Sequence, residues 1–118
     1  MSSLAGQKCE ACDNGGRCVT GAESLDLLKQ IPEWLIVERQ GVQRLERVYV
    51  FPDFAQAVDF TNKVAALAEE VGHHPAILTE WGRVTVSWWT HKIKGLHRND
   101  FIMAAKTDGI YEARADGS

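Results

Sequence analysis

The hydrophobic residues form two kinds of pattern along the chain: short β-branched or alternating stretches, and longer stretches with helical spacing. The short stretches predict four strands, and Gln40-Gly41 and Trp81-Gly82 are turn signals that join them into two antiparallel hairpins. In the second strand both faces are partly apolar, which suggests a sheet covered on more than one side. The predicted strands are residues 34–39, 44–51, 76–80 and 83–89.

Three segments have the caps and apolar spacing of helices. Thr20 and Glu23 form a capping-box pattern that opens a short helix before Pro32, and a last helix starts near Arg98. The apolar residues expected on their faces are Leu25, Leu28 and Ile31 in the first and Phe101, Ile102, Ala104 and Ala105 in the last.

The longest predicted helix has Asp53 as its N-cap, runs to Val71 and ends at Gly72, a residue type suited to the left-handed position after a helix. Its apolar stripes are Phe54, Ala57, Val58, Ala65 and Ala68, and Phe60, Val64, Leu67 and Val71. Two apolar faces are more than one sheet can cover. Either self-association or a wide core within one chain would bury the excess.

This order of elements predicts an α+β fold, α-β-β-α-β-β-α, with a four-stranded antiparallel sheet and helices packed on one face. The length of 118 residues suits a single domain, here residues 20–118 after a Gly-rich leader at residues 1–19. The net charge of -3 and the lack of a basic run argue against nucleic-acid binding. No apolar run reaches the ~20 residues of a membrane helix, and the N-terminus lacks a signal-peptide core. We therefore expect a cytoplasmic protein without membrane contact.

The three cysteines, Cys9, Cys12 and Cys18, all lie in the leader. An odd number in a cytoplasmic protein argues against a disulfide framework. Cys9 and Cys12 have a spacing that zinc sites use, but a second pair of ligands is missing nearby. Free thiols in the leader are the better interpretation, and zinc is the alternative.

Three of the four histidines, His73, His74 and His91, gather where two predicted elements end. His73 follows the helix that ends at Gly72, with Glu69 one turn back, and Pro75 restricts the backbone after His74. His91 follows Thr90 at the end of the last strand, and Asp100 lies in the first turn of the last helix, where a carboxylate could fix a histidine tautomer.

Imidazole both gives and takes protons near neutral pH, so this set suits general acid–base catalysis. The chain lacks a Gly-x-Ser-x-Gly motif, a P-loop and a Gly-x-Gly-x-x-Gly motif. Nucleophilic, phosphoryl-transfer and nucleotide-redox chemistries are therefore poorly supported. A metal site on the histidines and purely structural histidines remain alternatives at this point.

The ordered set Glu69-x-x-x-His73-His74-Pro75, Trp81, Thr90-His91, Gly95-Leu96 and Asp100 resembles the signature of the pterin-4a-carbinolamine dehydratases. The similarity extends over most of the chain from Thr20 to about Asp108. It implies dehydration of 4a-hydroxytetrahydrobiopterin to the quinonoid dihydropterin, without metal or cofactor, in the recycling that follows an aromatic amino acid hydroxylase. It also implies a homodimer or homotetramer.

Carried over to this chain, the resemblance makes His74 the leading acid–base group, with His73 and His91 beside the pterin and Glu69 and Asp100 as orienting carboxylates. Trp34 and Trp81 would be either aromatic walls of the pterin site or packing residues. The family usually has Thr at the position of His97. Either Asn99 or His97 could replace that cap, and we expect His97 to be an exposed loop residue. The rival interpretation is a protein-binding module, a transcriptional coactivator or assembly factor on the same fold.

Overall fold

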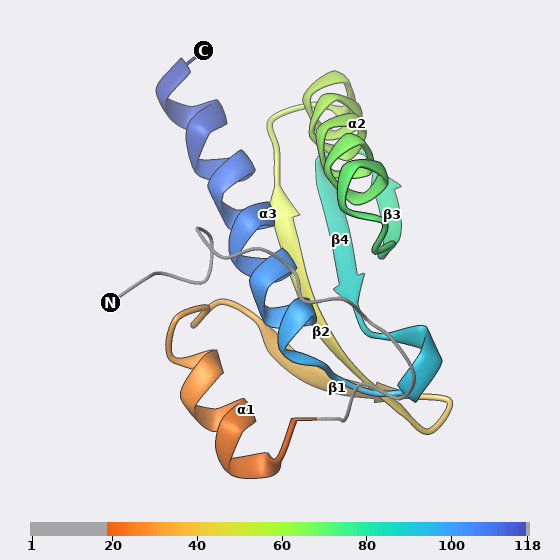
Figure 1. Ribbon diagram of the computed structural model, residues 1–118. Helices are drawn as coiled ribbons and strands as arrows, with labels where there is room; N and C mark the ends of the chain where they lie inside the picture. Colours follow the sequence, from red (N-terminus) through yellow and green to blue (C-terminus); the bar gives the residue numbers. More distant parts are fainter. Residues whose placement is uncertain (1–18, 118) are drawn as a thin grey trace.

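The computed structural model describes residues 19–117 and has the predicted order of elements (Figure 1). Residues 1–18, which hold the three cysteines and all but the last residue of the predicted leader, and residue 118 lie outside the described residues. The helices are α1 (Gly21–Leu28), α2 (Phe54–Val71) and α3 (Arg98–Gly117). The strands are β1 (Leu35–Arg39), β2 (Val42–Val50), β3 (Ala76–Glu80) and β4 (Arg83–Trp88). A short 3-10 turn, His91–Ile93, follows β4.

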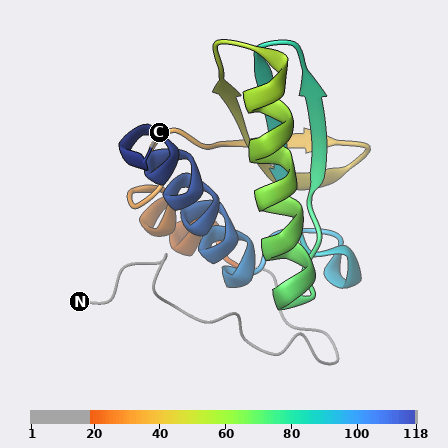
Figure 2. The same ribbon diagram turned by 90° about the horizontal axis from the view of Figure 1, so that it is seen from above.

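The four strands form one antiparallel sheet in the order β1-β2-β4-β3. Helices α2 and α3 lie side by side on one face of this sheet (Figure 2). Ala76 at the start of β3 is opposite Ser87 near the end of β4. The segment that leads into β3 therefore lies beside the segment that leaves β4, and this is where the histidines meet.

The predicted caps are confirmed. The side chain of Thr20 accepts the N–H of Glu23, whose carboxylate accepts the N–H of Thr20 in return. Asp53 caps α2 by accepting the N–H of Gln56 at 2.8 Å. Gly72 ends α2 with φ of 69°, a left-handed conformation that costs a residue with a Cβ atom roughly 1–2 kcal/mol.

The buried face of α1 differs from the predicted one. Leu25 is 67% exposed, whereas Leu27 is 7% exposed. Leu27 and Ile31 are four residues apart, and both enter the core, so the face is set by this pair. The prediction for Leu25 was wrong because a helix of two turns leaves its spacing ambiguous.

The core lies between the sheet and the helices. From α2 it takes Ala57, Phe60, Val64 and Ala68, while Phe54 at the start of the helix is 48% exposed. From β4 it takes Val84, Val86 and Trp88, as the period of two predicts. The opposite face of the sheet stays open along the described residues of the single chain, so the second cover suggested by the sequence is not supplied by these helices. Its exposed apolar side chains are Leu35, Val48, Val50 and Leu78.

A largely buried carboxylate, that of Asp108, ties α3 to the sheet. Its Oδ1 atom accepts hydrogen bonds from the Trp34 indole, the Arg47 guanidinium and the Tyr49 hydroxyl. The Arg47 guanidinium also lies over the Tyr49 ring, 4.4 Å from its centroid. This network ties the middle of α3 to β2 and to Trp34.

Candidate active site

Three histidines line one cavity of about 360 Å³. His73 and His74 come from the segment after α2, and His91 comes from the 3-10 turn after β4. The remaining lining residues are Gly72, Thr90 and Lys92. The structure therefore brings together the histidines that the sequence places about 17 residues apart.

His73 is held by Asp100, a fully buried carboxylate at the start of α3. The His73 Nε2 atom lies 2.6 Å from Asp100 Oδ1. Thr90 Oγ1 donates to Asp100 Oδ2 at 2.8 Å, so the same carboxylate connects the end of β4 with the end of α2. An ionised carboxylate only accepts, so His73 donates through Nε2 in this pair.

The ring of His73 also has a fixed plane. It stacks on Trp88 with centroids 5.7 Å apart and 5° between the planes. The side chain of His73 is 11% exposed, and that of Trp88 is fully buried. The Trp88 ring thus sets the plane of the His73 ring, and the Asp100 carboxylate sets its tautomer.

His74 faces solvent and has its own carboxylate. Its Nε2 atom lies 2.6 Å from Glu69 Oε1, and both side chains are more than half exposed. The spacing of four residues suggested Glu69 as a partner of His73, but the structure pairs it with His74. The left-handed Gly72 turns the chain out of the helix, so the helical i, i+4 geometry ends before His73.

His91 is an exposed side chain packed on Trp89, with ring centroids 4.5 Å apart. The guanidinium of Arg44 also lies over the Trp89 ring, 4.0 Å from its centroid, and makes a cation–π contact. The Nε atom of Arg44 is buried without a hydrogen-bond partner among the described residues. Sequence reasoning did not identify Arg44 or Trp89 as neighbours of the site. Arg44 lies in β2 and Trp89 directly follows β4, with α2 and β3 between them in the chain, so local sequence gives no signal for the pair.

The other predicted site residues lie outside the cavity. Trp34 is 2% exposed and donates to Asp108, so the structure places it in the core. Trp81 lies in the β3–β4 turn at the opposite end of β3 and is 73% exposed. Pro75 leads from His74 into β3. His97 is 7% exposed, so the expectation of an exposed loop histidine was wrong; it caps α3.

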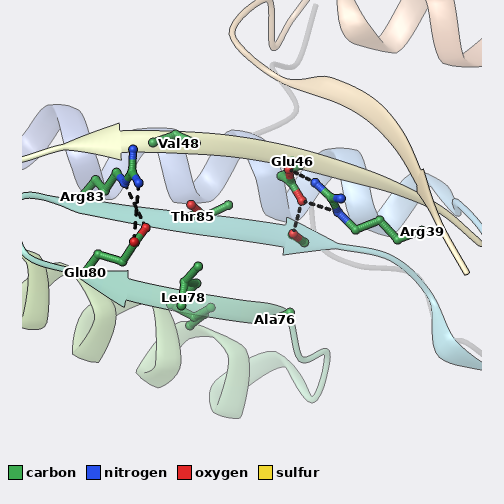
Figure 3. Close-up of a pocket in the computed structure, with 10 residues that line it drawn as sticks. Arg39, Glu46, Val48, Ala76, Leu78, Glu80, Arg83 and Thr85 are labelled. Atoms are coloured by element: carbon green, nitrogen blue, oxygen red, sulfur yellow. Dashed lines mark hydrogen bonds and ion pairs between the residues drawn. The ribbon is translucent and has the colours of Figure 1, made fainter.

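A larger cavity of about 480 Å³ lies on the open face of the sheet (Figure 3). Its charged side chains pair with each other: Arg39 with Glu46 at 2.8 Å, and Arg83 with Glu80 at 2.9 Å. The hydrogen bond from Arg39 holds the pKa of Glu46 below its usual value. These carboxylates are already neutralised by their partners, so the histidine cavity is the better candidate for acid–base chemistry.

Within residues 19–117, no three His, Cys, Asp or Glu side chains are grouped in a way that could hold a metal ion. None of the helices in this part of the chain combines the length and the hydropathy needed to cross a membrane.

The model of the pterin 4 alpha carbinolamine dehydratase family matches residues 18–110, and the chain belongs to this family. A Marinobacter nauticus protein with the provisional name pterin-4-alpha-carbinolamine dehydratase is 60% identical over 94% of this chain and 100% of its own length. A Nitrosococcus oceani protein with the same provisional name is also 60% identical, over 93% of this chain and 97% of its own length.

Solved structures show the same fold. A transcriptional coactivator/pterin dehydratase from Brucella melitensis superposes with a TM-score of 0.73 at 31% identity, covering 80% of this chain and 98% of its own. A pterin dehydratase-like protein described as a RuBisCO assembly factor of the alpha-carboxysome has a TM-score of 0.56 at 24% identity. That match covers 66% of this chain and 88% of the other chain, and at this identity it shows only that the two folds are similar.

Proposed function

We propose that this chain dehydrates 4a-hydroxytetrahydrobiopterin to quinonoid dihydrobiopterin by histidine general acid–base catalysis. The observation that carries the proposal is the convergence of His73, His74 and His91 on one cavity. Two of these imidazoles each have a carboxylate at 2.6 Å. The relatives' names supply the class of substrate.

The reaction breaks the bond between C4a and the hydroxyl oxygen of the pterin. One group protonates the departing hydroxyl, which leaves as water, while another accepts the proton of N5, and a C4a–N5 double bond forms. His74 is our leading acid–base group, because its ring lines the cavity, is more than half exposed, and has the Glu69 carboxylate at 2.6 Å from Nε2. His73 and His91 complete the set on the cavity walls. No metal or cofactor takes part in this route.

The direct test is stopped-flow absorbance of 4a-hydroxytetrahydrobiopterin, generated in place by an aromatic amino acid hydroxylase. We expect the wild-type protein to accelerate the decay and His74→Ala to lose a factor on the order of 10² or more. Lys63→Ala is a matched control, because it removes the exposed partner of Asp59 on the same helix, 3.2 Å away, without touching the cavity. Decay that is equally fast with and without wild-type protein would reject the proposal.

The hydroxylase used in this assay is also the proposed functional partner, as the source of the substrate in tetrahydrobiopterin recycling in the cytoplasm. We propose in addition that the chain acts as a homodimer or homotetramer. The open sheet face and the half-exposed Phe54 leave apolar surface that an oligomer could bury. Analytical ultracentrifugation should give two or four times the chain mass of 13.1 kDa, and a monomer at micromolar concentration would contradict this.

A second candidate function is protein binding through the open sheet face. The Brucella melitensis protein is described as a coactivator as well as a dehydratase. In this chain Val48 and Val50 are 49% and 65% exposed. If binding were the sole role, the His74→Ala variant would keep all function in the cell, which separates the two candidates.

A further inference from the structure

His97 is the fourth histidine, and it is not among the residues that line the cavity. It is 7% exposed and directly precedes α3. Its Nδ1 atom accepts the N–H of Asn99 at 3.0 Å. A ring nitrogen accepts a hydrogen bond only when it carries no proton, so the neutral His97 ring has its proton on Nε2.

The hydrogen bonds around His97 form a reciprocal cap of α3. The imidazole accepts an N–H of the first turn, and the backbone N–H of His97 donates to Asp100 Oδ2 at 2.9 Å. The Asp100 N–H in turn donates to the His97 carbonyl oxygen at 2.9 Å. This arrangement resembles the Thr20 and Glu23 capping box of α1, with an imidazole in place of the hydroxyl.

The cap fixes the rotation of the Asp100 carboxylate. Oδ2 accepts from two donors, the His97 N–H and the Thr90 hydroxyl. The other oxygen, Oδ1, is thereby directed at His73 Nε2. Loss of the imidazole cap would loosen the first turn of α3, and with it the backbone N–H of His97 that holds Oδ2.

We propose that His97 is a positioning residue of the dehydratase. Its unprotonated Nδ1 atom holds the first turn of α3 so that Asp100 keeps His73 in the tautomer with a proton on Nε2. The inference rests on the function proposed above. It assigns a role in the site to a histidine that is not part of the cavity wall.

The kinetic test compares His97→Ala, His97→Thr and Thr20→Ala in the stopped-flow assay. We expect His97→Ala to lower kcat by about tenfold with KM changed less than about twofold, because the reacting groups are displaced while the cavity remains. His97→Thr supplies a hydroxyl cap and should recover most of kcat. Thr20→Ala removes an equivalent cap at α1 and should leave kcat unchanged. An equal loss of kcat in Thr20→Ala would overturn the proposal, because the effect would then be general destabilisation.

The structural test uses ¹⁵N NMR of the imidazoles, which reports tautomers without any assay of activity. In the wild-type protein we expect an unprotonated Nδ1 on His97 and a protonated Nε2 on His73. In His97→Ala the His73 ring should become a mixture of tautomers. A protonated Nδ1 on neutral His97, or an unchanged His73 tautomer in His97→Ala, would overturn the proposal. A protonated Nδ1 on His97 in the wild-type spectrum overturns the proposal even if His97→Ala does not fold, and the His73 comparison decides even if the protein has no dehydratase activity.

Discussion

Replacement of Asp100 by asparagine is the most direct probe of the site, because it removes one charge and nearly no volume. The side-chain oxygen of the introduced asparagine can still accept from Thr90 and from the His97 N–H, so the cap of α3 survives. The side-chain amide then faces His73 Nε2, where the carboxylate oxygen lay at 2.6 Å. Two donors meet there, and His73 must move its proton to Nδ1 or give up the contact.

The size of the effect follows from the bond that is lost. A hydrogen bond to a charged group contributes ~1.5–3 kcal/mol, and Asp100 is fully buried, so solvent does not replace it. At ~1.36 kcal/mol for each factor of ten, kcat should fall by roughly tenfold to 150-fold. KM should change little, because the cavity keeps its shape.

The assay is stopped-flow decay of the 4a-hydroxytetrahydropterin, and Asp108→Asn is its matched control. Asp108 is a second carboxylate on the same helix, largely buried, with three donors of its own, and it lies away from the histidines. Asp108→Asn should lower the melting temperature and retain kcat. Full kcat in Asp100→Asn, or the same loss of kcat in both variants, would refute the reasoning that the Asp100 charge sets the state of His73.

Two further predictions concern Tyr49 and Trp89. Burial, followed by the charge of Asp108, raises the pKa of the Tyr49 hydroxyl. Above about pH 10 this hydroxyl therefore ionises only in the unfolded chain, so the free energy of unfolding should fall with rising pH by up to ~1.4 kcal/mol per pH unit. Denaturant titrations at several pH values should show a smaller fall for Tyr49→Phe than for the wild type. Equal slopes against pH would contradict this. Trp89→Leu removes the ring contact of His91 at 4.5 Å and should lower kcat/KM about two- to tenfold, whereas Trp81→Leu should not; equal losses would contradict the assignment.

Much of the fold follows from local signals in the sequence. The caps at Thr20, Asp53 and Gly72 and the turn residues place the elements to within one or two residues. These signals act between near neighbours in the chain, and the structure confirms them. The face of α1 and the open face of the sheet depend on which elements meet in space, and local spacing does not determine that.

The candidate site also has parts that could be predicted from the sequence and parts that could not. The histidines could be found because they flank element ends that the topology brings together. The pairing of Glu69 with His74 could not be predicted, because the left-handed Gly72 changes the direction of the chain between these two residues. The burial of His97 was also missed, since an imidazole that caps a helix is rarer than the usual hydroxyl or carboxylate.

The two interior carboxylates of α3, Asp100 and Asp108, hold different kinds of partner. Asp108 satisfies the polar groups of Trp34 and Tyr49, which the core must bury, so packing explains it. Asp100 serves instead an imidazole at the wall of an open cavity. A buried ionic pair contributes little to stability compared with apolar residues of similar volume. Asp100 also accepts from the Thr90 hydroxyl and the His97 N–H, and those two hydrogen bonds would serve a binding module as well. The link from Asp100 to His73 is the part of the network that the proposed dehydratase uses, because it holds the imidazole in one tautomer.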